Sequence, residues 1–386
     1  MSARRALLLA LATIALGAPA CKRKTPPVAE AAWLGPTHAC ARIKVAGDVR
    51  CWGANGDGEL WLDVPAPAAS QLVPAPSLVP RDVRALGFGR GFSCALEAAG
   101  RVRCWGVNDE GQLGDGASAP SRVPRDVAAS GVSAIAVGAR HACLVAEAGA
   151  LRCWGANGAR EVSPAEPEPR VRRPVRVELP GPVRAFAVGE AHTCAATSEP
   201  RTLTCWGESA KGRLGERTDE LTKAGITQLT AGAAHTCALT DAARVYCWGA
   251  NDVGQLGDGT RVDSARPVLV ARVDGATAVR AGRAHTCALL RSGTVACWGA
   301  NDAHQLADGT TTPRSEPVPL HGIVSVREIL LAGDASCVLL ADGQLRCWGK
   351  NDRGQLGDGS TTPHDVPMPV RFSLGAPRVV ASAGRY

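Results

Sequence analysis

Cysteine is the residue type in this chain that offers the most chemistry, and fourteen of the fifteen cysteines recur in pairs. The second cysteine of each pair opens a Cys-Trp-Gly tripeptide, and the first lies ten or eleven positions earlier. The pairs are Cys40 and Cys51, Cys94 and Cys104, Cys143 and Cys153, Cys194 and Cys205, Cys237 and Cys247, Cys287 and Cys297, and Cys337 and Cys347. Regularly spaced thiols can bind zinc, exchange electrons or form disulfides. Zinc is disfavoured, because no Cys-x-x-Cys or Cys-x-x-His spacing occurs in the sequence.

Histidines and acidic residues also recur, and their pattern favours structure over metal binding. Five histidines occupy one repeat position, where Phe92 stands in the second copy; they are His38, His141, His192, His235 and His285. Copies of a repeat lie in equivalent environments far apart, so we expect each imidazole to bond backbone within its own unit. The turn cassette Asn251–Thr260 carries alternating oxygen ligands but lacks the terminal bidentate glutamate of a calcium loop. We predict no metal and no cofactor.

A β-hairpin in each repeat explains the cysteine pairs. In the sixth copy, Cys287 and Cys297 are equidistant from Ser292, which lies between Arg291 and Gly293. A three-residue turn with Gly293 in the left-handed region would place the two cysteines opposite each other. Directly opposed residues on antiparallel strands have a Cα separation that a disulfide can bridge. We predict seven disulfides, one in each hairpin, with free buried thiols as the alternative.

The tryptophan of each Cys-Trp-Gly tripeptide indicates how the hairpins assemble. Because side chains alternate along a strand, Cys297 and Trp298 face opposite sides of the sheet. A sheet that is buried on both faces lies between two others, and a tryptophan in every repeat supplies a large contact between neighbours. The period of about fifty residues indicates copies of one supersecondary unit. We therefore predict an all-β, seven-bladed β-propeller, with proline-containing runs such as residues 267–270 as outer edge strands.

Two motifs that recur in order resemble the repeats of the regulator of chromosome condensation family. One is Gly-x-x-His-[Thr/Ala]-Cys, and the other is Gly-x-Asn-Asp-x-Gly-Gln-Leu-Gly, as in residues 249–257. The resemblance extends from residue 34 to the C-terminus and implies seven blades of four strands. Seven copies imply a closed ring. Residues 379–386 resemble the strand before each His-x-Cys, so we predict that this C-terminal strand pairs into the first blade beside His38 and Cys40.

The N-terminal residues indicate export. Arg4 and Arg5 precede an apolar stretch that is too short to span a bilayer comfortably, so residues 1–20 are predicted to be a signal peptide. This stretch ends at Cys21, the cysteine without a partner, and resembles a bacterial lipobox, although Ala18 stands where leucine is usual. We predict lipidation of Cys21. Ordinary secretion with a free thiol is the alternative.

These segments define the predicted organisation of the chain. Residues 21–33 would form a lipidated tether, and residues 34–386 would form the propeller. The predicted location is the cell envelope, as an outer-membrane or surface lipoprotein, or otherwise the periplasm or the outside of the cell. A lipid would be the only membrane anchor, since no later apolar run is long enough to span a bilayer.

Departures from the repeat are the predicted places for recognition. Insertions follow the cassettes of the first and third copies, at residues 62–80 and 159–182. Insertions at one repeat position map to loops on one side of a structure, often the binding side. The candidate binding residues are Trp61, Arg170, Arg172 and Arg173. A solvated loop stiffened by proline is the simpler interpretation. The fourth copy is short and replaces the cassette with residues 208–214.

Composition and motifs then limit the class of function. The formal net charge of +7 includes the basic N-terminal residues, and no basic stripe follows, so we expect no nucleic-acid partner. No Ser-His-Asp order, phosphate loop or pair of non-repeat carboxylates specifies catalysis. We predict a monomeric, non-catalytic binding module with an unknown protein or glycan partner in the envelope or outside the cell. The alternatives are an envelope lyase or hydrolase and a secreted enzyme inhibitor, because the family resembles in fold a secreted β-lactamase inhibitor.

Overall fold

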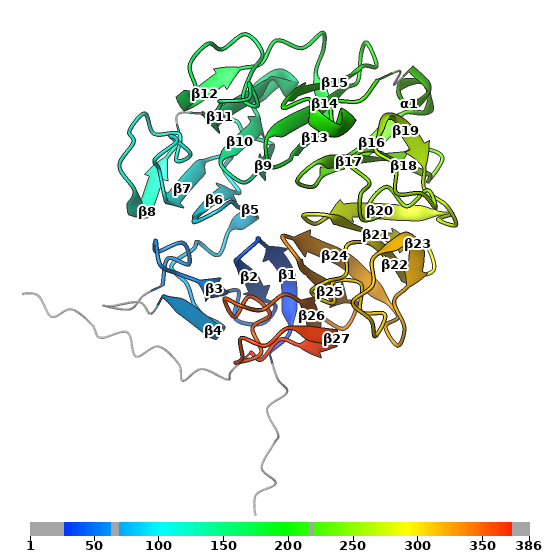
Figure 1. Cartoon of the computed structure of the whole chain (residues 1–386). Helices are drawn as coiled ribbons and strands as arrows, with labels where there is room; N and C mark the ends of the chain where they lie inside the picture. The colour runs from blue at the N-terminus through cyan, green and yellow to red at the C-terminus, as the bar shows by residue number, and fades with distance from the viewer. Residues whose placement is uncertain (1–26, 63–68, 128, 217–218, 373–386) are drawn as a thin grey trace, which may run out of the picture.

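Seven antiparallel sheets stand radially around a central channel in the computed structural model of this chain (Figure 1). The structure describes residues 27–372 with the exception of 63–68, 128 and 217–218. Within each sheet the strands neighbour one another in chain order, and the first strand lines the channel. The predicted all-β seven-bladed propeller is confirmed.

The first three blades have four strands each. Blades one and two contain β1 (Ala29–Leu34), β2 (His38–Ile43), β3 (Val49–Ala54), β4 (Ser70–Pro76), β5 (Val83–Phe88), β6 (Phe92–Glu97), β7 (Val102–Gly106) and β8 (Ser121–Asp126). Blade three contains β9 (Ala134–Val137), β10 (His141–Val145), β11 (Leu151–Ala156) and β12 (Arg170–Arg176), with the short 3-10 helix η1 (Glu147–Gly149) between β10 and β11.

Blade four departs from this plan, and blades five to seven return to it. Blade four has the three strands β13 (Val183–Val188), β14 (His192–Thr197) and β15 (Leu203–Gly207), followed by η2 (Ala210–Gly212) and the helix α1 (Asp219–Ala224). The remaining strands are β16 (Ile226–Ala231), β17 (His235–Thr240), β18 (Val245–Gly249), β19 (Ser264–Leu269), β20 (Ala276–Ala281), β21 (His285–Leu290), β22 (Val295–Gly299), β23 (Arg314–Pro319), β24 (Val326–Ala332), β25 (Ala335–Leu340), β26 (Leu345–Gly349) and β27 (His364–Pro369). As predicted, the proline-containing runs form the outermost strands β19, β23 and β27.

One disulfide joins the second and third strands of every blade, as predicted. The two Cα atoms are 4.1 Å apart in each of the seven bridges. In blade six the hairpin turn has the expected form, because Gly293 has φ +78° and its N–H donates to the Leu290 carbonyl at 2.8 Å. The bridges are local, since each closes a single hairpin.

The tryptophans join each blade to the preceding one. Their side chains are exposed by 4% or less, and each indole Nε1 donates to a backbone carbonyl in the preceding cassette. In blade six, Trp298 Nε1 lies 2.9 Å from the Gln255 carbonyl oxygen. A Cβ on Gly257 would lie 2.6 Å from the same nitrogen, which explains the glycine after Gln-Leu in the cassette. The predicted role of tryptophan as an inter-blade contact is confirmed.

The same contact closes the ring. Trp52 Nε1 in blade one donates to the Gln355 carbonyl in blade seven at 2.9 Å, and the Ala29 N–H donates to the Gly343 carbonyl at 2.8 Å. The C-terminal residues 379–386 lie outside the described residues. The position predicted for them, beside Cys40, is taken by β1, in which Trp33 is the partner of Cys40. This part of the closure prediction is corrected: all four strands of blade one come from the N-terminal part of the chain.

The segment boundaries also differ from two predictions. The strand β1 begins at Ala29, so the last residues of the predicted tether, 21–33, belong to the first blade. The insertions at 62–80 and 159–182 are not simply loops, because each contains the fourth strand of its blade, β4 and β12 respectively. The arginines of the second segment, apart from Arg160, therefore lie on the outer edge strand β12.

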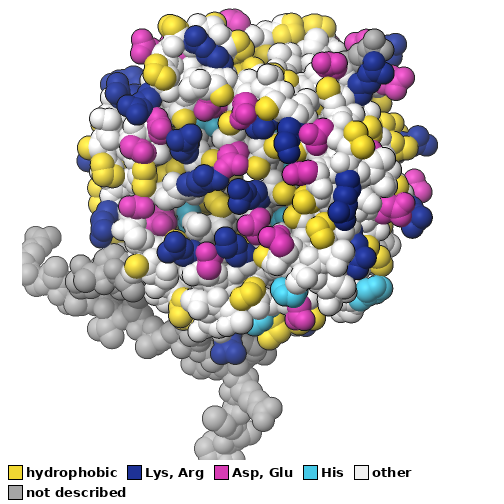
Figure 2. Space-filling view, viewed as in Figure 1, with side chains coloured by type: hydrophobic (Ala, Val, Ile, Leu, Met, Phe, Trp, Pro, Cys, Tyr) yellow, Lys and Arg dark blue, Asp and Glu magenta, His cyan; other side chains and the backbone are white. Residues whose placement is uncertain are grey.

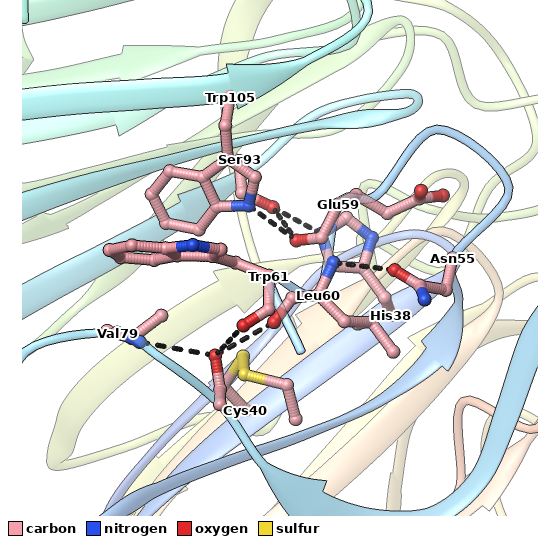
Figure 3. The surroundings of a disulfide bond; sticks show 11 residues. His38, Cys40, Asn55, Glu59, Leu60, Trp61, Val79, Ser93 and Trp105 are labelled. Carbon is pink, nitrogen blue, oxygen red and sulfur yellow. Dashed lines mark hydrogen bonds between the residues drawn. A yellow bond between two sulfur atoms is a disulfide. The ribbon is translucent and has the colours of Figure 1, made fainter. Parts of the chain in front are cut away.

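The repeated histidines bridge neighbouring blades, whereas we predicted bonds to backbone in their own blade. His38 Nε2 in blade one lies 2.8 Å from Ser93 Oγ in blade two (Figure 3). Ser93 Oγ donates to the Glu59 carbonyl in blade one at 2.8 Å, and Trp105 Nε1 donates to the same oxygen at 2.9 Å. The correction has a physical reason: β2 places the ring at the blade interface, where the nearest acceptor is the neighbouring hydroxyl.

Candidate functional site

The central channel holds a cavity of about 740 Å³ at the end of the propeller that carries the cassettes. We call this end the cassette face and the opposite end, which carries the turns between second and third strands, the hairpin face. Residues from all seven blades line the cavity, and its walls are mainly small or apolar side chains of the innermost strands, such as Val137, Val188 and Ala281.

The loops between the first and second strands form the rim of this cavity. In the Gly-x-x-His loops of blades three to six, the first residue is a glycine that packs under the imidazole of its own motif. A Cβ on Gly282 would lie 2.1 Å from His285 Cε1, and one on Gly189 would lie 2.4 Å from His192 Cε1. Because the glycine allows the loop to fold tightly over the buried ring, the next residue is placed at the channel mouth.

Charged side chains follow these glycines at the mouth. Arg90, Glu190, Arg283 and Asp334 each come directly after the loop glycine, and Lys350 follows the Cys-Trp-Gly of blade seven. The space-filling view shows acidic and basic side chains interspersed around the central hollow (Figure 2). We call these five residues the channel rim. They come from four blades, so only the closed ring brings them together.

Partial burial and neighbouring charges shift the pKa values of two channel-rim residues, Arg90 and Asp334. Arg90 forms an ion pair with Glu190, and its pKa is lowered by burial and by the nearby cations Arg283 and Arg140. Burial raises the pKa of Asp334, although Arg283 and Lys350 act in the opposite direction. Lys350 Nζ lies 4.0 Å from Asp334 and 3.7 Å from Asp352. The rim therefore presents partly desolvated charges of both signs, which suits a polar or peptide-like partner.

A second part of the channel, of about 500 Å³, opens on the inner strands towards the hairpin face. Its lining includes Arg280 and Glu328. Burial lowers the pKa of Arg280 and raises the pKa of Glu328, while each charge partly offsets the effect on the other. The two carry opposite charges and lie on the neighbouring inner strands β20 and β24.

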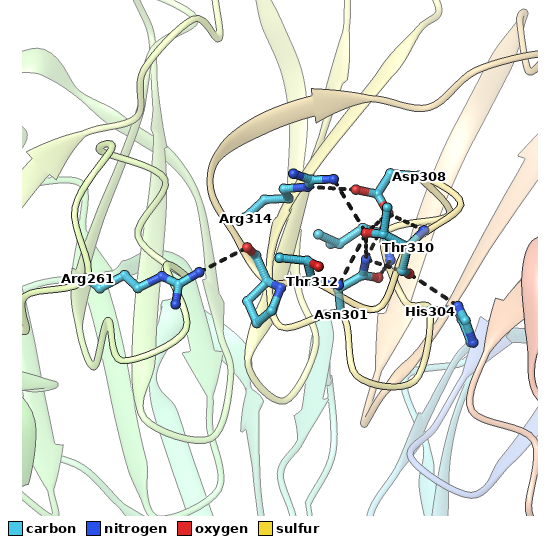
Figure 4. Close-up of polar contacts among 9 residues, drawn as sticks. Arg261, Asn301, His304, Asp308, Thr310, Thr312 and Arg314 are labelled. Atoms are coloured by element: carbon cyan, nitrogen blue, oxygen red, sulfur yellow. Dashed lines mark hydrogen bonds and ion pairs between the residues drawn. The ribbon is translucent and has the colours of Figure 1, made fainter.

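The cassettes are self-contained polar turns. In blade six, Asn301 Nδ2 donates to Asp308 at 2.8 Å and to the Thr310 carbonyl at 2.9 Å, and its Oδ1 accepts from the Leu306 N–H at 3.0 Å (Figure 4). Arg314 Nε donates to the other Asp308 oxygen at 2.7 Å. The oxygens of the cassette are thus used in holding its own turn. Among the described residues, no group of three or more His, Cys, Asp or Glu side chains is arranged to hold a metal ion.

A family model described as the RCC1-like domain matches residues 24–386, which is most of the chain. This chain belongs to the RCC1-like family. The ultraviolet-B receptor UVR8 of Arabidopsis thaliana is 29% identical over 251 residues, covering 61% of this chain and 56% of the receptor. The E3 ubiquitin-protein ligase HERC2 of Homo sapiens is 29% identical over 262 residues, covering 62% of this chain and 5% of the ligase. The chain thus spans about half of UVR8 and a twentieth of HERC2.

Solved structures show the same RCC1-like fold. Prp20p of Saccharomyces cerevisiae superposes with a TM-score of 0.74 at 20% identity, covering 84% of this chain and 86% of Prp20p. The CRINKLY WD40 ectodomain of the receptor kinase ACR4 of Arabidopsis thaliana superposes with a TM-score of 0.52 at 18% identity, covering 89% of this chain and all of that one. At these identities the likeness concerns the fold alone.

The structure separates the binding residues that the sequence suggested in this RCC1-like chain. Arg170, Arg172 and Arg173 lie exposed on β12, at the outside of blade three. Arg170 Nε forms an ion pair with Glu110 of blade two at 2.8 Å, and Arg172 packs over Gly111 in the same cassette. The arginines thus contact the neighbouring cassette and lie away from the channel rim.

Trp61 lies in blade one and is partly buried. Its ring lies 5.5 Å from that of Trp105, and the Arg103 guanidinium lies 5.7 Å from its centre. It therefore extends the contact between blades one and two and is not grouped with the arginines of β12. Cys21, the predicted lipidation site, lies outside the described residues.

The channel rim was missed from the sequence, although the sequence contains a signal for it. In blades two to seven the glycine of this loop is kept, but the residue after it differs from blade to blade: it is Arg90, Ala139, Glu190, Ala233, Arg283 and Asp334. A position that varies in charge inside an otherwise strict repeat is free of packing constraints. No helix in the described part of the chain is long and apolar enough to cross a membrane.

Proposed function

We propose that this chain is an exported protein-binding propeller that receives its partner at the channel rim. The observation that carries the proposal is the set of charges of both signs, Arg90, Glu190, Arg283, Asp334 and Lys350, which the closed ring holds around one cavity. Preorganised charges favour association because the protein loses little conformational freedom on binding. Prp20p, which shares the fold, binds Gsp1p and histones, which supports a protein as the partner class.

The disulfides support the proposed location. Seven bridges form and persist in oxidising compartments and are rare in the cytosol of most organisms. We propose that residues 1–20 direct export and that Cys21 carries a lipid that holds the propeller at the cell envelope. Incorporation of labelled palmitate into the full chain, and its loss in Cys21→Ser, tests the anchor. Equal labelling of both proteins would contradict it.

Affinity capture from envelope and culture extracts tests the binding role. The baits are residues 25–386, a rim variant, Arg283→Glu with Lys350→Glu, and a control variant, Arg244→Glu with Arg291→Glu, in exposed hairpin-face turns. Both variants change the net charge equally. We expect one specific protein to be retained by the parent and the control and lost from the rim variant. Retention of that protein by all three baits would contradict binding at the rim.

A further inference from the structure

Blade four leaves the outer edge of β15 without a neighbouring strand. In every other blade the third strand pairs with a fourth strand on its outer side. In blade four the sheet ends at β15 within the described residues, and the chain continues through η2 and α1 (Figure 1). No proline or lysine lies in β15 to discourage pairing, although such residues commonly protect exposed edges.

The backbone groups of β15 point to the vacant side. Cys194 and Cys205 are directly opposed with their Cα atoms 4.1 Å apart, a separation typical of the antiparallel pair that does not exchange backbone hydrogen bonds. The N–H and C=O of Cys205 therefore point away from β14. Leu203 lies two residues earlier, so its backbone N–H and C=O also point away from β14. In blade five the equivalent carbonyl, that of Val245, accepts from the Val270 N–H at 3.0 Å.

The side chains near this edge are also uncovered. Cys205 is partly exposed, whereas the other thirteen bridged cysteines are exposed by 2% or less. Leu203 is partly exposed, whereas its counterpart Val245 is completely buried. The helix α1 contributes the buried Leu221 to the core cluster that also contains Trp248 and Leu229, and Leu203 and Cys205 pack against this cluster while remaining partly exposed. Cover for the edge is therefore missing, although the core of the blade is complete.

The six other blades show what fits such an edge. Their fourth strands are extended segments with an internal proline, and four of them, β8, β12, β19 and β23, carry arginine. The strands β12, β19, β23 and β27 are each followed by a buried valine or leucine, namely Val177, Val270, Leu320 and Val370. In blade four, the segment in place of this strand instead exposes Glu216, Asp219 and Glu220, which form no ion pair with any described residue.

We propose that the edge of β15 is a strand-addition site for a basic, proline-containing extended segment of a partner protein. The added strand would run antiparallel to β15, accept from the Cys205 N–H and donate to the Leu203 carbonyl. Arginines of the segment would meet the exposed acids Glu216, Asp219 and Glu220, and its last aliphatic residue would cover Leu203. This surface is on the outside of blade four and is separate from the channel rim, so it stands whether or not the rim binds a partner.

Hydrogen exchange of two amides gives the first test. In the free protein the Cys205 N–H should exchange quickly, and the Cys247 N–H, which has the same register in blade five, should be protected. A peptide copying residues 169–178, the β12 strand and its flanks, should protect the Cys205 N–H when added in excess. Protection of Cys205 in the free monomer would overturn the proposal.

Binding measurements with matched probes give the second test. The peptide should bind the parent about tenfold more tightly than the same peptide with N-methylvaline at the position of Val177, because in blade three the Val177 N–H, directly after β12, donates to the Leu151 carbonyl of the third strand. The triple variant Glu216→Gln, Asp219→Asn, Glu220→Gln should bind more weakly and with a smaller dependence on salt.

A variant in which blade four carries a fourth strand of its own gives the third test. Replacing residues 208–225 with residues 250–275 would give blade four the cassette and fourth strand of blade five. This variant should fold and should not bind the peptide. Equal binding by the parent and this variant would overturn the proposal. Protection of Cys205 that appears only as the protein concentration rises would identify a second copy as the occupant, and would also overturn it.

Discussion

His38 and Ser93 form a hydrogen bond across the boundary between blades one and two, with Nε2 and Oγ 2.8 Å apart. The equivalent pairs are His141 with Thr193, His192 with Thr236, His235 with Thr286, and His285 with Ser336. The two interfaces without a histidine have Phe92 facing blade three and Ala335 facing blade one, and there the hydroxyl is replaced by Ala142 and Ala39. Histidine and hydroxyl therefore occur together or not at all.

Acid should unfold the propeller through these histidines. Burial lowers the pKa of His38, His141, His192 and His285 to about 3, and that of His235 to about 4. The unfolded chain titrates near the usual value of about 6.5, so the stability gained from neutral histidines is complete above that pH and is lost progressively as the pH falls towards the folded-state values of about 3 to 4. Between pH 7 and pH 5 each histidine should remove about 2 kcal/mol from the free energy of unfolding.

Urea unfolding at pH 7, 6 and 5 measures this loss. The double variant His285→Phe with Ser336→Ala reproduces the natural pair of Phe92 and Ala142, and it should make the stability less dependent on pH. A transition midpoint that stays constant from pH 7 to pH 5 in the parent would show that these histidines do not remain neutral in the folded state.

The loop glycine should be intolerant of a methyl group. In Gly282→Ala the new Cβ would meet His285 Cε1 at 2.1 Å and the Gly333 carbonyl oxygen at 2.9 Å. We expect a loss of about 1–3 kcal/mol from overpacking. The control is Gly309→Ala, because a Cβ there meets nothing within 4 Å, although its φ of +76° adds local strain. Thermal unfolding of both variants makes the comparison, and a smaller loss for Gly282→Ala than for Gly309→Ala would contradict the packing argument.

The interface between blades seven and one, which closes the ring, should depend on its tryptophan as much as the other blade interfaces depend on theirs. Trp52→Phe removes the hydrogen bond from blade one to Gln355 of blade seven, and Trp298→Phe removes the equivalent bond from blade six to Gln255 of blade five. Both variants should lose a similar amount of stability, because the two interfaces use the same contact. A much smaller effect of Trp52→Phe on the melting temperature would mean that the ring is held closed elsewhere.

Removing one disulfide should weaken one hairpin. The double variant Cys287→Ala with Cys297→Ala opens a loop of ten residues in sequence separation, and we expect a loss of about 3 kcal/mol in the chain-entropy model. Hydrogen exchange should rise mainly in β21 and β22, because the bridge lies within one blade. Uniform loosening of all seven blades would contradict the view that the bridges are local.

The regular parts of the fold could be predicted because the same short-range spacing of cysteine, glycine and tryptophan recurs in the repeats. The spacing of Cys287, Gly293 and Cys297 determines a hairpin with a three-residue turn. Cys297 and Trp298 are consecutive, so their side chains face opposite sides of the sheet, and this predicts a sheet that is buried on both faces. The histidine contact was not predicted, because hydrogen bonds between blades join residues about fifty positions apart. Comparing His38 with Ser93, and Phe92 with Ala142, would have revealed it.

The closure and the channel rim could not be predicted for related reasons. Two segments, residues 29–34 and 379–386, resemble an inner strand, and only the three-dimensional arrangement shows that the first of them pairs with β2. The rim residues Arg283 and Lys350 are far apart in sequence from Arg90 and Glu190, and they meet only when the ring closes. The residues of the long insertions attracted attention first, but Arg170 was found to contact Glu110 of the neighbouring blade.

Photo-crosslinking in the cells that make the protein tests the proposed binding face most directly. A photoreactive amino acid would replace Lys350 at the channel rim in one variant, and Val45, a hairpin-face residue that is 95% exposed, in the other. Our account predicts one discrete protein adduct from position 350 and none from position 45. An adduct from position 45 alone, or the same adduct from both positions, would contradict it.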